Sequence, residues 1–151
     1  MPNKNLYNKA DGQEILDRLA RLDVSSKGKW GKMSVSQMMK HLSTAFDVAL
    51  GKVQLPHTQP HYSLLANPIG RWLIIDGMTW PHGTPGPPAF IIKDQPDFEE
   101  QKTALTGNII AFIGSDNSAT ADHPLVGKLD RSAWGRFMYK HADHHFRQFG
   151  V

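Results

Sequence analysis

Three histidines lie within five residues near the C-terminal end of the chain, at His141, His144 and His145. Two side chains four residues apart on a helix lie one above the other, with their Cβ atoms about 5–6 Å apart. At that distance the imidazoles of His141 and His145 can converge on one ion. Three uses are open at this point: a metal site, a proton-handling cluster, or polar residues on the surface of a terminal helix.

The position of these histidines on the predicted helix narrows the choice. At about 100° per residue, His141 and His145 fall in the middle of an apolar stripe and His144 falls on its shoulder. The stripe is formed by Trp134, Phe137, Met138 and Phe149. Burying an imidazole without a partner costs on the order of 1–3 kcal/mol. The interior must therefore supply a partner, which is either an ion or another polar group or water.

A third inward histidine lies on an earlier predicted helix, in the stretch QMMKHLSTAF. Met38, Ala45 and Ala49 mark the buried face of this helix, and His41 lies on its inward shoulder. The two alanines are small and leave space beside the imidazole. Three inward histidines from two helices predict a site for zinc, nickel or another divalent ion that keeps coordination positions open for water or substrate.

Two features limit this metal-site prediction. Ala142 follows His141, whereas the zincin metalloproteases need a Glu at that position as general base. His144 is not expected to be a ligand, because one ion does not readily take two adjacent residues of the same helix. We expect His144 beside the ligands or exposed to solvent.

The other histidines fall in predicted loops, where a solvated or turn histidine is the simpler interpretation. His82 and His123 lie in the two longest loops, so either could reach a site at the end of the helices. His82 is therefore a candidate substrate contact. Trp72, Trp80 and Trp134 are candidates for the wall of an apolar substrate pocket, although large aromatic residues more often belong to a core.

Five segments have the apolar periodicity of helices and are separated by Gly- and Pro-rich stretches. They cover roughly residues 10–22, 34–50, 62–76, 96–113 and 131–148. Pro68 and Gly70 predict a kink or a break in the third segment. The segments 80–90 and 114–129 are long loops, and the first is expected to cover the open side of the histidine site. Strand signals are poor, so the prediction is an all-α antiparallel helix bundle with two long loops.

Local signals mark several helix ends. Ser34 and Gln37 match a capping box. Asp130 can cap the last helix, and Gly150 follows that helix as a C-cap glycine does. Pro96 is expected near the first turn of the fourth helix.

Length and composition indicate one domain covering residues 1–151. The chain has no cysteine, which excludes disulfides, thiolate ligands and a cysteine nucleophile. The net charge of +3, without a nucleic-acid-binding motif, predicts no nucleic-acid partner. The N-terminal residues lack the apolar core of a signal peptide, and no run is long enough to span a membrane. We therefore expect a cytoplasmic protein without membrane association.

Four stretches of the sequence carry a resemblance to a known family: KWGKMSVSQMMKHL (29–42), MTWPHGTPG (78–86), HPLVGKLDRSAWGRFMYKH (123–141) and HADHHFRQFG (141–150). They resemble the DinB-like superfamily of four-helix metalloenzymes, in the branch described as a domain of unknown function. The resemblance extends over nearly the whole chain. Its specific part is the pair of histidine-bearing stretches, because helices alone would fit many bundles.

The resemblance implies a DinB-like antiparallel four-helix bundle with an additional short helix. It also implies a divalent metal at one end of the bundle, often nickel or zinc. The family pattern of one histidine on the second helix and an H-x-x-x-H pair on the last corresponds to His41, His141 and His145. Frequent homodimers are a further implication. Better-understood relatives use low-molecular-weight thiols, as thiol S-transferases or a maleylpyruvate isomerase.

The leading hypothesis is a metal-dependent enzyme that acts on a small-molecule substrate, with an exogenous low-molecular-weight thiol as a candidate cosubstrate. The sequence has no cysteine, no Ser-His-acid arrangement and no nucleophile-elbow glycine pattern. The simplest nucleophile is therefore a water or thiol activated by the ion. Thiol transfer is the first expected reaction and hydrolysis the second. The alternative is a non-catalytic helical bundle that binds a small ligand or a partner, with a structural metal or none.

Overall fold

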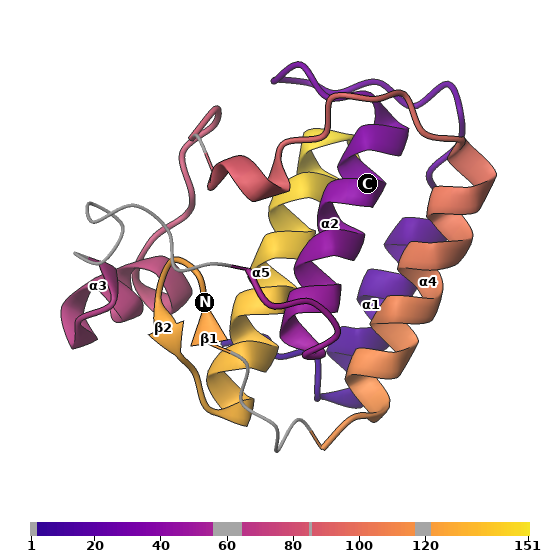
Figure 1. The fold of residues 1–151 in the computed structure, drawn as a ribbon. Coiled ribbons are helices and arrows are strands. Elements are labelled where there is room, and N and C mark those ends of the chain that lie inside the picture. The colour runs from indigo at the N-terminus through magenta and orange to yellow at the C-terminus, as the bar shows by residue number, and fades with distance from the viewer. Residues whose placement is uncertain (1–2, 56–64, 85, 117–121) are drawn as a thin grey trace.

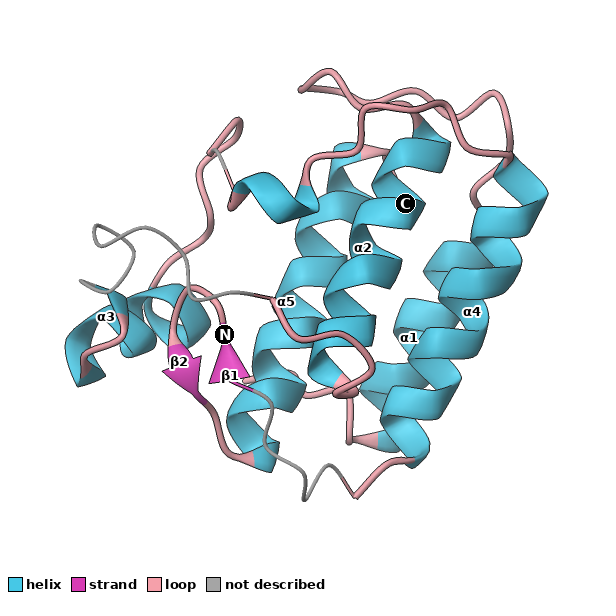
Figure 2. Ribbon diagram, viewed as in Figure 1, coloured by secondary structure: helices cyan, strands magenta, loops and turns pink. Residues whose placement is uncertain are grey.

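Helices make up most of the protein, in agreement with the predicted all-α class. The computed structural model describes residues 3–55, 65–84, 86–116 and 122–151. Within these ranges four long helices lie side by side (Figures 1 and 2): α1 (Lys9–Ala20), α2 (Val35–Ala49), α4 (Phe98–Gly114) and α5 (Arg131–Gln148). None of the helices in the described ranges has both the length and the apolar character needed to cross a membrane.

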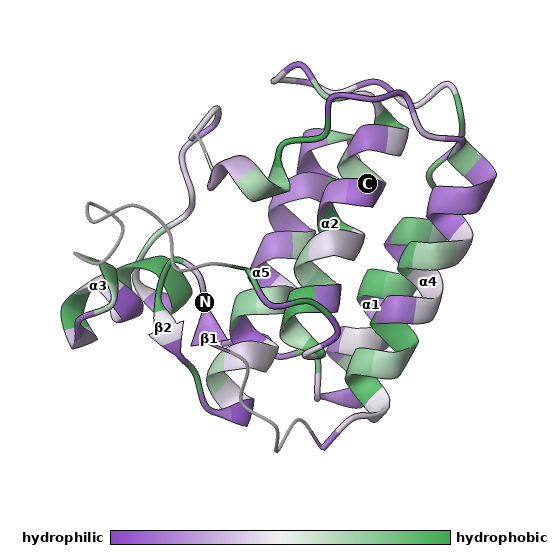
Figure 3. Ribbon diagram, viewed as in Figure 1, coloured by the Kyte–Doolittle hydropathy of each residue, from purple (hydrophilic) through white to green (hydrophobic). Residues whose placement is uncertain are grey.

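The long helices share one cluster of buried apolar side chains. Helix α2 packs against α4 and α5, and α1 packs against the same two helices. Each long helix contributes a side chain with no exposed surface: Ile15, Phe46, Phe112 and Phe146. Figure 3 shows apolar residues (green) alternating with polar residues (purple) along α1, α2 and α4, which is the pattern of helices with one buried face.

The helices begin at side chains that satisfy their free backbone N–H groups. Ser34 and Gln37 exchange hydrogen bonds at the start of α2, which confirms the predicted capping box. Asp130 caps α5, also as predicted. Helix α4 begins two residues after Pro96, because the side chain of Asp97 acts as its N-cap and sets the first turn.

In the third predicted helical segment, residues 62–76, the described helix begins at Pro68 and is shorter than predicted. Residues 62–64 lie outside the described residues, and the part that follows contains α3 (Pro68–Trp72), which continues as a π-helical turn, η2 (Leu73–Gly77). Pro68 begins α3 instead of breaking it. Its missing N–H falls in the first helical turn, where an N–H has no partner within the helix.

The loop 114–129 contains a short hairpin that the sequence does not indicate. Strand β1 (Asp122–His123) pairs antiparallel with β2 (Gly127–Lys128), and residues 117–121 lie outside the described residues. The turn is held by the Nδ1 atom of His123, which accepts hydrogen bonds from two backbone N–H groups at 3.0 and 3.3 Å. Strands of two residues are too short to show the apolar alternation from which strands are predicted.

The loop 80–90 is fastened to the helices at both ends. At its start, Trp80 Nε1 donates a hydrogen bond of 2.8 Å to the carbonyl oxygen of Ile74 in η2. At its end, a 3-10 turn, η3 (Pro88–Phe90), packs against α2. Residue 85 lies outside the described residues. These contacts place the loop beside the face of α2 that carries His41.

Candidate metal centre and its cavity

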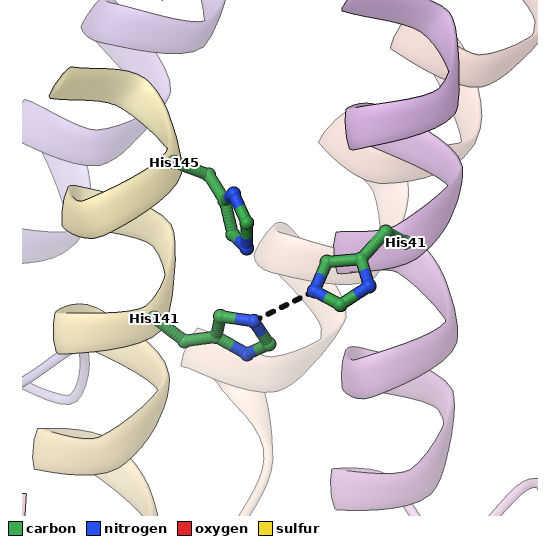
Figure 4. Close-up of side chains that lie close together, drawn as sticks. All are labelled: His41, His141 and His145. Carbon is green, nitrogen blue, oxygen red and sulfur yellow. Dashed lines mark hydrogen bonds between the residues drawn. The ribbon is translucent and has the colours of Figure 1, made fainter. Parts of the chain in front are cut away.

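Three histidines from two helices converge at the interface of α2 and α5 (Figure 4). His41 extends from α2, and His141 and His145 extend from successive turns of α5. The Nε2 atoms of His41 and His141 are 2.9 Å apart, and one nitrogen of each histidine lies within 4.8 Å of the others. The fold therefore assembles the predicted three-histidine group, and this group could hold a metal ion.

Burial keeps these imidazoles in the neutral form that a metal ligand requires. Loss of hydration lowers the pKa of His145 to about 3 and holds the pKa of His141 well below its usual range. Burial also lowers the pKa of His41, although the hydrogen bond to Phe90 opposes the shift. At neutral pH the three side chains thus carry no positive charge.

Two of the three histidines have their tautomers fixed by an outer hydrogen bond. His41 Nδ1 donates to the carbonyl oxygen of Phe90 at 2.9 Å, because a carbonyl only accepts. His145 Nδ1 donates to the Gln148 side-chain oxygen at 2.8 Å, and the Gln148 amide nitrogen donates to the Trp30 carbonyl at 2.8 Å. Both histidines therefore keep the Nε2 lone pair for the shared space, as ligating histidines do.

His141 is held differently. Among the described residues, its buried Nδ1 atom has no hydrogen-bond partner. The ring instead packs between Trp80 and Phe137, with ring centroids 5.4 and 5.9 Å away. Without an ion, His141 Nε2–H can donate to His41 Nε2, which leaves the Nδ1 lone pair unsatisfied. An ion on Nε2 moves the proton to Nδ1, so aromatic packing orients His141 in either case.

The geometry fits a divalent ion. Zinc binds imidazole nitrogens at about 2.0–2.1 Å, so the ligands of one ion lie within about 4 Å of one another, and the three nitrogens here lie within 4.8 Å. The donor set is purely imidazole, which suits zinc, nickel, copper and iron.

The histidine group forms part of the wall of a cavity of about 510 Å³. This volume lies within the range of small-molecule sites, about 300–1,000 Å³. The apolar part of the wall includes Met33, Ala45, Val48, Ile74, Met78, Trp80, Phe90, Ile91, Leu125 and Phe137. A small molecule in this cavity has direct access to the three histidines.

The loop 80–90 lies beside the three-histidine group, at the position the prediction gave it. Trp80, Thr84 and Phe90 all line the cavity, and Phe90 also supplies the carbonyl that orients His41. Trp80 was expected in the wall of a substrate pocket, and it lies there. The loop therefore both encloses the cavity and fixes one of the candidate ligands.

His144 and His82 lie beside the metal group and are not part of it. His144 lines the cavity, with its ring centroid 5.1 Å from that of His145 and 5.8 Å from that of Trp80. His82 is exposed and stacks on Trp30, with ring centroids 3.7 Å apart. In contrast to the prediction, His82 is not among the residues that line the cavity.

Two tryptophans predicted for the pocket wall lie elsewhere. Trp134 has no exposed surface, packs against His123 and Phe137 in the core, and is not among the residues that line the cavity. Trp72 is 57% exposed on α3 and does not line the cavity. Aromatic residue type alone therefore does not identify this wall.

Reasoning from the sequence missed two contributions to the site and left a third open. The sequence left His123 open between a solvated or turn histidine and a histidine that reaches the site. It forms a turn, is buried and lines the cavity, and burial lowers its pKa to about 3. Gln148 could have been found from the sequence, since a polar residue three positions after His145 lies on the same inward side of α5. The carbonyls of Phe90 and Trp30 could not have been found in this way, because every residue carries a backbone carbonyl.

Comparison with known proteins gives a family. No curated protein and no solved structure matches the chain significantly. A family model described as "Protein of unknown function (DUF1569)" matches residues 3–150. The matched range contains both histidine-bearing helices and the loops that line the cavity. The chain therefore belongs to the DUF1569 family of proteins of unknown function.

Proposed function

We propose that this protein is a metal-dependent enzyme of the DinB-like type, in which His41, His141 and His145 bind one zinc or nickel ion. The observation that carries the proposal is the convergence of three neutral imidazoles in the wall of a cavity large enough for a small molecule. The mutual packing of α1, α2, α4 and α5 supports the finer assignment to an antiparallel four-helix bundle.

The residues of the chain prepare the site for an ion and a substrate. Phe90 and Gln148 hold the Nδ1 protons of His41 and His145, so that both Nε2 lone pairs face the shared space. Trp80 and Phe90 place aromatic surface in the cavity wall beside the histidines. A divalent ion bound there supplies Lewis acidity, which lowers the pKa of a water molecule or a thiol toward neutrality.

The absence of carboxylates in the described cavity wall favours a nucleophile that comes from outside the chain. The chain also has no cysteine. We therefore place thiol transfer from an exogenous low-molecular-weight thiol first and hydrolysis second, with a small molecule as the substrate. The resemblance to the DinB-like superfamily further leads us to expect a homodimer, which light scattering on the purified protein measures.

The first test is elemental analysis of protein purified without a histidine tag or a chelator. The expected result is one zinc or nickel ion per chain. A panel of halogenated aromatics and esters is then assayed with and without added thiols. Turnover should disappear with a chelator and return when zinc or nickel is added.

Two results contradict this mechanism: turnover that survives complete removal of metal, and a covalent adduct on a side chain of the protein. Binding of small molecules without turnover, at full metal occupancy or none, assigns the protein instead to the class of non-catalytic ligand-binding bundles.

A further inference from the structure

The cavity beside the histidine group has a wall without charged side chains. Among the described residues, no Asp, Glu, Lys or Arg lines it. The segments outside the described ranges, residues 1–2, 56–64, 85 and 117–121, contain none of these residue types either. The wall therefore offers neither a carboxylate for a cation nor an ammonium or guanidinium group for an anion.

Two lysines that directly precede candidate ligands in the chain have partners of their own. Lys140 directly precedes His141 on α5, and its Nζ donates to the carbonyls of Ile74 and Ile75 at 2.9 and 3.3 Å. Lys40 precedes His41 on α2, and its Nζ donates to Asp94 at 2.7 Å. Neither cation belongs to the cavity wall. A charged ligand would thus lose hydration without gaining an opposite charge.

The polar side chains of the wall are few. They are the imidazoles of His41, His123, His141, His144 and His145 and the hydroxyl of Thr84. The Thr84 hydroxyl donates to the carbonyl of Pro81 at 2.9 Å. His123 Nδ1 accepts from the backbone of its own turn. The nitrogens of the three-histidine group and of the adjacent His144 remain as the polar part of an otherwise apolar wall.

We infer that this cavity takes an uncharged, largely apolar molecule, whose single polar group faces His41, His141 and His145. The inference rests on the function proposed above, and it names the substrate class: a neutral ester, amide or aromatic electrophile, and not a phosphorylated or multiply charged metabolite. The apolar body of the molecule packs against side chains such as Val48, Ile91 and Phe137.

The experiment measures cavity occupancy in metal-free protein, so that its outcome does not depend on the ion. The probe is N-phenyl-1-naphthylamine, an uncharged fluorophore, at about pH 8, where histidine is neutral. Three competitors share one apolar body: methyl 4-phenylbutanoate, 4-phenylbutanoate and 4-phenylbutylammonium. The ester should displace the probe at a concentration roughly tenfold or more below that of either ion. Displacement by either ion at the concentration of the ester overturns the inference.

A matched pair of variants locates the probe. Ile91 lines the cavity and Ile110 lies on α4 outside it, and the two are 58% and 56% exposed, so that neither change empties the core. Ile91→Asp should weaken probe binding about fivefold or more by placing a charge in the wall, and Ile110→Asp should leave it unchanged. Ile91→Lys should also shift competition toward the carboxylate. Equal effects of the two Asp variants, or none, show that the probe does not occupy this cavity and overturn the inference.

The metal analysis remains a separate measurement. A preference for the ester in a protein that never binds metal refutes the proposed enzyme and leaves the cavity assignment intact. One ion per chain with no preference for the ester refutes the cavity assignment alone.

Discussion

Helix α5 carries two groups of polar side chains on opposite sides, and the two groups are built differently. On the side of α1, Asp143 accepts a hydrogen bond of 2.7 Å from Arg18, whose side chain is only 8% exposed. On the side of the cavity, His141 and His145 are equally buried, but no carboxylate of the described wall faces them. We refer to the first group as the α1–α5 ion-pair cluster; it comprises Lys4, Glu14, Arg18, Tyr139 and Asp143.

The difference separates a structural contact from a binding site. In the ion-pair cluster, opposite charges and hydrogen bonds satisfy one another: Tyr139 donates to Glu14 at 2.9 Å, and Lys4 pairs with the same carboxylate. On the cavity side, the outer nitrogens of His41 and His145 are satisfied, whereas their Nε2 atoms are directed into a common space. Of these two groups, as far as the described residues show, the one on the cavity side therefore keeps atoms that are able to bind an ion.

The largest expected effect is on metal content. Each of the single variants His41→Ala, His141→Ala and His145→Ala should lose stoichiometric metal binding, because only two of the three proposed imidazole ligands then remain. His144→Ala is the matched control, and Asp143→Asn disturbs the opposite cluster; both should retain one ion per chain. Mass spectrometry of the metal in purified protein measures these contents. Unchanged occupancy in one of the three variants removes that residue from the site.

A smaller effect is expected from the partner of His145. Gln148→Leu removes the acceptor of His145 Nδ1–H, and loss of such an outer hydrogen bond typically lowers metal affinity about 10–100-fold. Gln148→Glu keeps an acceptor and should recover most of the affinity, as measured by competition with a chromophoric chelator. Gln13→Leu, at an exposed site on α1, is the control. Equal affinities for all three variants would show that the hydrogen bond has no role in metal binding.

The free energy of unfolding contributed by the buried histidines of the cavity wall and that contributed by the α1–α5 ion-pair cluster should depend on pH in different ranges. Burial holds the pKa of His123 and His145 at about 3, against 6.5 for an ordinary histidine. Between these values the unfolded chain binds a proton that the folded chain does not. The free energy of unfolding of metal-free protein should thus fall as pH drops from about 6.5, by about 1.4 kcal/mol per pH unit for each such histidine.

Glu14 provides the contrasting case. Its hydrogen bond with Lys4 is the main cause that lowers its pKa from 4.5, so the stability it contributes is complete above about pH 4.5 and is lost only below that value. Urea unfolding between pH 5 and 7.5 distinguishes the clusters. His145→Leu should reduce the slope, and Glu14→Gln should leave it unchanged. If the dependence of the unfolding free energy on pH is the same in His145→Leu as in the unmodified protein, the buried His145 is not its cause.

The smallest expected effect is on the stability contributed by the ion-pair cluster. Asp143→Asn leaves the buried guanidinium of Arg18 with a weaker partner, Glu14 at 3.6 Å. We expect the free energy of unfolding to decrease by about 1–3 kcal/mol, without change in metal content. Chemical denaturation measures the decrease, with Arg147→Gln, at a more exposed partner of Asp143, as a control that should have little effect. A loss of metal in Asp143→Asn would show that the clusters are coupled.

Helical periodicity predicts the cavity side of this comparison well and its surroundings poorly. The angular positions of His41, His141 and His145 follow from 3.6 residues per turn and from the apolar stripes around them, so that their meeting could be predicted. Trp80 and Trp134 are the same residue type, yet one lines the cavity and the other is core. That distinction depends on how the loop 80–90 folds back on η2 and α2, for which the sequence has no periodic signal.

The same limit applies to the start of α3 and to the hairpin in the loop 114–129. Pro68 was expected to interrupt a helix that it in fact begins, because its effect depends on where the helix starts and not on the residue itself. The pairing of β1 with β2 rests on the buried ring of His123, which binds backbone N–H groups of the turn. Both features depend on the local path of the main chain, which cannot be predicted from apolar periodicity.

The acceptors behind the candidate ligands have a practical consequence for protein engineering. His41 is oriented by the carbonyl of Phe90, and Gln148 is oriented by the carbonyl of Trp30. A backbone carbonyl survives any side-chain replacement that preserves the local main-chain path. The side chains of the loop 80–90 can therefore be randomised to reshape what the cavity accepts, while the hydrogen bond that orients His41 is retained, so this loop is the natural place to diversify selectivity by directed evolution.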